Sequence, residues 1–160
     1  MRLRVLILPI LLIAGPACAQ TPPPPMKLLA DSASTQALIL KEKAEIKPGQ
    51  AFVSEPLVVL APYTVNLDYR ALPGAPSVHE TEAELFYVVE GRGTLTVGGT
   101  MTDPKRTNAT NLAGAGITGG TDYSLSKGDL FFVPQGVPHM WVPMGGPVID
   151  LSLHVTRPLP

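Results

Sequence analysis

Short β-rich segments that end at glycine or proline constrain this chain more than any other feature. The 160 residues include 18 prolines and 15 glycines, and the valine, leucine and aromatic residues lie in short runs between them. Proline removes a backbone donor and glycine weakens an extended strand, so both interrupt regular structure. The pattern predicts an all-β fold of many short strands joined by tight turns, with one helix near the N-terminus.

Two stretches hold the residues best suited to chemistry. The first places His79 five residues before Glu84, and an apolar strand then leads to Gly91. The second begins at Gly128 and is a strand followed by a Pro/Gly turn and His139. Imidazole and carboxylate together suit first-row divalent ions, so these residues point to a metal site.

These stretches resemble the two motifs of the cupin family, His-x-His-x(3–4)-Glu-x(6)-Gly and Gly-x(5)-Pro-x-Gly-x(2)-His-x(3)-Asn. When Glu84 and Gly91 are taken as fixed points, His79 is the family's second histidine. Ser77 then stands where the family has its first histidine. The second motif agrees except at its last position, with Gly128, Pro134, Gly136 and His139 in place and Pro143 instead of asparagine.

The resemblance implies a conical jelly-roll β-barrel of two facing sheets. It also implies that His79, Glu84 and His139 are metal ligands and that Ser77 is at most a weak fourth ligand. Two imidazoles and one carboxylate bind Mn, Fe, Ni or Zn and leave positions open for water or substrate. The sequence therefore predicts a divalent metal cofactor without identifying the metal.

The apolar strand of the first motif gives two further expectations. Its spacing to Gly91 places Glu84 at the head of the buried strand, whereas Glu80 and Glu82 fall in the preceding turn and are expected to be solvated. Residues 85–89 are apolar at every position, which predicts burial on both faces of the strand. The outer face would then lie against a second subunit or the N-terminal helix, and we expect a homodimer.

Several residues outside the motifs could reach the pocket. Residues 63–70 alternate between apolar and polar, so one face looks into the barrel. If that face is polar, Arg70 could hold an anionic substrate group; the favoured interpretation is a surface pair with Asp68. Trp141 lies two residues after the second motif's histidine, and therefore lies either in the pocket or in the core. A lone histidine at a strand end, such as His154, is expected to be solvated.

Two segments are expected to lie apart from the barrel strands. Residues 32–47 predict a helix on the outside of the fold, with Leu38 and Leu40 in its apolar stripe and Glu42 on its solvent-facing side. Residues 98–120 are rich in Thr, Asn and Gly and predict a long exposed hairpin. A lid over the barrel mouth is one role open to this hairpin.

The first 19 residues predict a secretory signal peptide. An apolar run follows Arg2 and Arg4, and small residues lead up to Ala19, after which we expect cleavage. An acylated Cys18 is the alternative, which the residues before it disfavour. Cleavage would place a thiol-free domain in the periplasm or outside the cell.

Composition and length complete the expected organisation. The formal net charge is −1 and no basic run occurs, which argues against nucleic acid and anionic membrane surfaces as partners. The apolar run at the N-terminus is too short for a stable membrane span. We expect a signal peptide at 1–19, a Pro-rich linker at 20–31 and a single cupin domain at 32–160.

Cupins have many activities, so the fold alone does not give the function. The first hypothesis is an exported metal-dependent enzyme of the dioxygenase, isomerase or lyase type that acts on a small molecule. The alternatives are a small-ligand-binding cupin without turnover, with Trp141 as a stacking surface, and a structural dimer with a vestigial site. No catalytic residue beyond the metal ligands is assigned.

Overall fold

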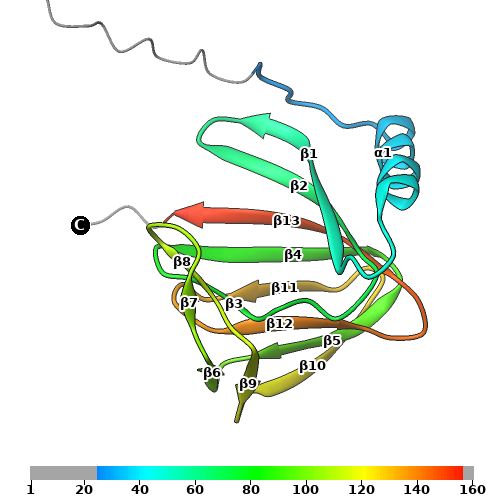
Figure 1. Cartoon of the computed structure of the whole chain (residues 1–160). Helices are drawn as coiled ribbons and strands as arrows, with labels where there is room; N and C mark the ends of the chain where they lie inside the picture. The colour runs from blue at the N-terminus through cyan, green and yellow to red at the C-terminus, as the bar shows by residue number, and fades with distance from the viewer. Residues whose placement is uncertain (1–24, 157–160) are drawn as a thin grey trace, which may run out of the picture.

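A computed structural model describes residues 25–156, in which one helix is followed by a series of antiparallel strands (Figure 1). The expected signal peptide, its cleavage site, Cys18 and most of the linker lie outside the described residues. The five-stranded sheet contains, in spatial order, β1 (Phe52–Leu60), β2 (Tyr63–Arg70), β13 (Val148–Thr156), β4 (Glu82–Glu90) and β11 (Leu130–Val133). The six-stranded sheet contains β10 (Thr121–Ser126), β5 (Arg92–Val97), β12 (His139–Pro143), β3 (Ser77–His79), β8 (Asn111–Ala113) and β7 (Lys105–Arg106). A small ribbon pairs β6 (Thr100–Thr102) with β9 (Gly116–Thr118).

The two large sheets face each other and form the predicted jelly roll. Within the described chain their hydrogen-bonded ladders remain separate and do not close into a single ring. The inner faces enclose a core built from β4, β5, β11, β12 and β13, in which Phe86, Leu95 and Trp141 are the largest of the buried side chains. Apolar burial between two sheets is the main stabilising contribution in such a fold.

Helix α1 (Ser32–Glu45) stands beside β1 and β2 (Figure 1). The Asp31 side chain caps its N-terminus by accepting a 2.7 Å hydrogen bond from the Ser34 amide. As predicted, the helix packs on the outside of the fold, but the predicted stripe is wrong in detail. Leu40 is 65% exposed, while Ile39 and Glu42 are buried. Few large apolar residues mark one side of this helix, so its contacts with the sheet decide its rotation.

Strand β2 separates the helix from the barrel interior. Leu67 and Tyr69 pack with Ile39 on the outer face of the sheet. Asp68 and Arg70 therefore project between the two sheets, where Asp68 is 3% exposed. The favoured interpretation of these two residues as a surface pair is wrong, because α1 covers the apolar face and leaves the polar face to line the interior.

The segment 98–120 extends the six-stranded sheet. Its strand β8 pairs with β3, with Asn111 directly opposite His79, and β7 pairs with β8 in turn. Ala113 contributes to the wall of the internal cavity. The segment therefore supports the strand that carries the first motif's histidine.

Candidate metal centre

Four strands bring the candidate residues together between the two sheets. Ser77 and His139 are directly opposite each other on β3 and β12, and His79 ends β3. Glu84 and His154 are directly opposite each other on β4 and β13. Opposite residues of an antiparallel pair lie on the same face, so each pair projects from its own sheet toward the other.

Two motif glycines shape the turns around this cluster. Gly91 follows β4 with a φ of +83°, and a Cβ atom there would collide with the backbone carbonyl of Pro147. Gly136 has a φ of +74° in the turn before β12. Its N–H donates a 2.8 Å hydrogen bond to the carbonyl oxygen of His79, which ties the second motif's turn to the first motif's strand.

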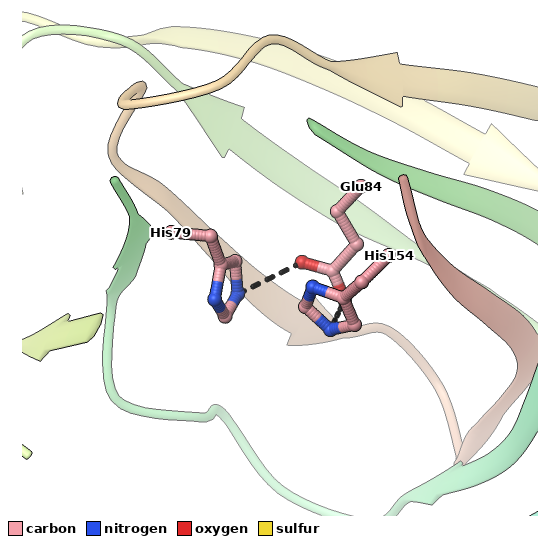
Figure 2. A group of neighbouring side chains, drawn as sticks. All are labelled: His79, Glu84 and His154. Carbon is pink, nitrogen blue, oxygen red and sulfur yellow. Dashed lines mark ion pairs between the residues drawn. The ribbon is translucent and has the colours of Figure 1, made fainter. Parts of the chain in front are cut away.

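Glu84 is the centre of the cluster. Its Oε2 lies 3.1 Å from Nε2 of His79 and 3.0 Å from Nε2 of His139. Its Oε1 lies 3.4 Å from Nε2 of His154, and Figure 2 shows the His79 and His154 rings beside this carboxylate. The chain contains 3 histidines, and all of them present Nε2 to the same carboxylate.

The other ring nitrogens of the two motif histidines face hydrogen-bond acceptors. Nδ1 of His139 lies 3.1 Å from the carbonyl oxygen of Val137, and Nδ1 of His79 lies 3.1 Å from Oδ1 of Asn111. These oxygens only accept, so each Nδ1 carries the proton. In the neutral ring Nε2 then holds a lone pair, which is the tautomer that a metal ligand requires.

His154 belongs to neither motif and has a similar orientation, although its Nδ1 makes no hydrogen bond within the described residues. Its Nδ1 lies 3.4 Å from Oε2 of Glu82, while Nε2 faces Glu84. The expectations that His154 and Glu82 are solvated are therefore wrong: their side chains are 30% and 29% exposed and contact each other beside the cluster. Glu80 is partly exposed and forms a 2.7 Å ion pair with Arg106 away from the site.

The charge of the cluster calls for a cation. Burial raises the pKa of Glu84, but contacts with His139 and His79 outweigh it and hold the pKa well below its usual range. Burial lowers the pKa of His79, but the contact with Glu84 outweighs that effect and raises it. Either a proton or a metal ion between these groups would be stabilised.

The side chains fit a divalent metal. Donors that share an ion at about 2.0–2.2 Å lie about 3–3.5 Å apart, as the Glu84 contacts do. Donor atoms of His79, Glu84 and His154 all lie within 4.8 Å of one another. Oε2 of Glu84 is buried and, within residues 25–156, faces only Nε2 of His79 and Nε2 of His139, which places it for coordination.

Ser77 contacts a motif histidine, whereas its motif position implies a metal ligand. Its Oγ lies 3.0 Å from Nε2 of His139, so the hydroxyl can donate to the lone pair that would otherwise face a metal. Among the described residues, the donor atoms that lie within 4.8 Å of one another are those of His79, Glu84 and His154, whereas the resemblance implies His139 in the place of His154.

A cavity of about 320 Å³ lies beside the cluster, and the metal-site side chains form part of its wall. This volume is near the lower end of small-molecule pockets, about 300–1,000 Å³. Trp141 also lines the cavity, is 3% exposed and packs edge-on against Phe86 with ring centroids 5.7 Å apart. It therefore belongs to both the core and the cavity wall.

Arg70 lies in the same wall, between two carboxylates. Its Nε donates to Oδ1 of Asp150 at 2.7 Å, and its Nη2 donates to Oδ2 of Asp68 at 2.6 Å. Burial raises the pKa of Asp150 to about 7, although Arg70 opposes this shift. Burial disfavours the charged form of Arg70, but the charges of Asp150 and Asp68 outweigh it and raise the pKa of the guanidinium.

The facing sheets and the internal cluster define a jelly-roll protein with a candidate metal site between its sheets. Comparison with protein families matches residues 63–149 to the family described as Cupin. The match covers more than half of the chain and includes both motifs, so the chain belongs to the cupin family. His154 lies beyond the matched stretch.

Three solved structures are similar to this chain in fold. The Cnp3 cupin domain of Schizosaccharomyces pombe is 16% identical, with a TM-score of 0.50 and coverage of 72% of each chain. KdgF from Halomonas sp. is 17% identical, with a TM-score of 0.50 and coverage of 69% of this chain and 86% of that chain. TT1209 from Thermus thermophilus is 18% identical, with a TM-score of 0.50 and coverage of 72% of this chain and 94% of that chain. Comparison with curated protein sequences gives no match.

No helix within residues 25–156 has the length and apolar character that crossing a membrane requires.

Proposed function

We propose that this cupin is an exported metal-dependent enzyme, whose divalent ion is held by Glu84 and the three histidines and acts on a small molecule in the adjacent cavity. The observation that carries the proposal is the common orientation of His79, His139 and His154. Each presents Nε2 to Glu84 while an acceptor faces its Nδ1. Bound Mn, Fe, Ni or Zn would supply Lewis acidity or, for the redox-active metals, oxygen activation.

His154 would compensate for the histidine missing at Ser77. The family's motifs provide three histidines and one glutamate, and His154 restores that count from the last strand. Glu82 would orient the His154 ring, as carboxylates commonly do for metal-bound imidazole. A site with all four ligands still has positions for substrate if the ion is five- or six-coordinate.

Elemental analysis of the protein, purified without chelator or metal-affinity tag, tests the proposal. Wild type should contain one metal ion per chain. Alanine at His79, Glu84, His139 or His154 should remove most of it, because each supplies one bond of the set. Ser77→Ala should lose little metal, since a hydroxyl is a weak donor beside imidazole or carboxylate.

Glu80→Ala is the matched control, because Glu80 is a nearby carboxylate whose partner is Arg106 outside the site. It should keep wild-type metal content. A wild-type protein without metal would favour a vestigial site and refute the proposal. Loss of metal in Glu82→Ala but not in Glu84→Ala would assign the coordinating carboxylate to Glu82. Metal-dependent product formation would then distinguish an enzyme from a binding protein.

A further inference from the structure

The cavity carries its own charge pattern, set by three residues of β2 and β13. Asp68 and Asp150 are directly opposite each other on these strands, and Arg70 contacts both carboxylates. Asp68 alone cancels the charge of Arg70, whatever the protonation state of Asp150. Glu84 adds a negative charge to the same wall. Arg70 therefore gives the cavity no excess positive charge that would attract an anion.

The guanidinium of Arg70 is also enclosed by protein groups. Its Nε and Nη2 donate to carboxylate oxygens at 2.6–3.2 Å. The rings of Phe52, Phe86 and Trp141 lie 5.4–5.7 Å from its central carbon. Aromatic faces and paired carboxylates satisfy a guanidinium well, so these contacts favour a structural role. They do not support Arg70 as the binding group for an anionic substrate.

One carboxylate oxygen of Asp68 accepts no hydrogen bond within the described residues. Its side chain is 4% exposed and lines the cavity, and its Oδ2 accepts the bond from Arg70. Its Oδ1 is buried and accepts no hydrogen bond from the described part of the chain. Nε1 of Trp141, a second cavity residue, is a buried donor that likewise has no partner there. Buried polar atoms without partners destabilise a protein, so a ligand that satisfies them gains affinity.

We propose that the part of the cavity beside Asp68 selects small ligands that present a neutral or cationic hydrogen-bond donor, a hydroxyl or ammonium group, to Asp68 and disfavours a carboxylate or phosphate at that position. A hydroxyl can also accept the N–H of Trp141. The cavity volume of about 320 Å³ suits a ligand of roughly one ring. This inference names the substrate class of the proposed enzyme and rests on that proposal in treating the cavity as its ligand site.

Fluorescence of Trp141 tests the selectivity, because it is the single tryptophan of the chain and lines the cavity. Cyclohexylmethanol, cyclohexylmethylamine and cyclohexanecarboxylate have similar shapes and can be titrated into metal-free protein, in which no metal ion can bind the carboxylate. The alcohol and the amine should bind at least about tenfold more tightly than the carboxylate, the effect of one hydrogen bond to a charged group. Equal or tighter carboxylate binding would overturn the proposal.

Two variants separate the hydrogen bond from the charge. Asp68→Asn keeps the shape but weakens the acceptor, so amine binding should fall about tenfold and carboxylate binding should rise. Asp150 lies behind Arg70, outside the cavity lining. Asp150→Asn should therefore change alcohol binding less than about twofold.

An unchanged ranking of the three probes in Asp68→Asn would also overturn the inference. Metal content is measured on the same samples. A protein without metal would refute the proposed enzyme, whereas the ranking in metal-free protein still tests the role of Asp68. The two proposals can therefore fail separately.

Discussion

Glu42 is a buried carboxylate that should make the stability of this fold depend on pH. The residue lies on α1, is 0% exposed, and neither carboxylate oxygen has a hydrogen-bond partner among the described residues. Burial, reinforced by the nearby charges of Asp68 and Glu55, raises its pKa to about 8. The folded protein therefore keeps Glu42 protonated at pH values where the unfolded chain has released the proton.

The sign and size of the effect follow from this shift. Below the unfolded pKa of 4.5, Glu42 is protonated in both the folded and the unfolded state, so it does not make stability depend on pH. As the pH rises from 4.5 to about 8, stability is lost progressively, and it levels off once the folded state also ionises. Each pKa unit corresponds to about 1.4 kcal/mol, so the free energy of unfolding that is lost between pH 4.5 and pH 7 is at most about 3.4 kcal/mol. Solvent screening reduces this limit, and we expect about 2 kcal/mol.

Glu42→Gln should remove this dependence, because the amide has a similar shape and does not ionise. Urea unfolding, followed by tryptophan fluorescence between pH 4 and pH 9, measures the free energy of unfolding of both proteins. The variant should match wild type near pH 4 and exceed it by about 2 kcal/mol at pH 7. Glu45→Gln is the matched control, since Glu45 is on the same helix with its side chain 50% exposed. A difference between Glu42→Gln and wild type that is constant with pH would refute the argument.

Three further predictions concern the site, the assembly and export. Ser77→His should slow the loss of bound metal to a chelator, because a further imidazole would face the candidate metal centre. An unchanged rate of metal loss would show that position 77 does not point at the metal. The paired strands β4 and β11 expose three large apolar side chains, Tyr87 at 40%, Leu130 at 63% and Phe132 at 50%. Light scattering should therefore give the mass of a dimer, and Phe132→Lys should lower that mass towards one chain; a wild-type monomer at micromolar concentration would contradict this expectation. Residues 1–19 should export a fused reporter and leave Gln20 as the mature N-terminus, whereas an intact cytoplasmic chain would rule out the signal peptide.

The sequence predicted the fold because its strands and turns are marked locally. Glycine and proline interrupt the β-rich runs, and the spacing of the two motifs places their histidines and Glu84 near strand ends. Alternation along β2 also separated an apolar face from a polar one. It could not say which face looks inward, because that depends on α1, which covers Leu67 and Tyr69 from outside. The position of Arg70 is therefore a consequence of tertiary packing.

The burial of Glu42 has a similar origin. Helix α1 has weak apolar patterning, and the surrounding charged residues made Glu42 look like part of a solvated face. Contact of the neighbouring Ile39 with the sheet turns Glu42 inward as well. A local pattern predicts which residues share a helix face, but a weak pattern leaves the rotation of the helix to its packing partner.

His154 shows most clearly what the sequence could not predict. On β13 the residues Asp150, Ser152 and His154 alternate with apolar ones, a pattern that suits a solvated face and a polar cavity equally well. The ladder between β13 and β4 is irregular: Ile149 is opposite Glu90, but Asp150 is opposite Val88, so Val89 is an extra residue in β4. Without this bulge His154 would be opposite Leu85, whose side chain points to the other face. One additional residue in β4 therefore brings the third histidine into line with Glu84, and neither motif spacing nor hydrophobic periodicity encodes that shift in register.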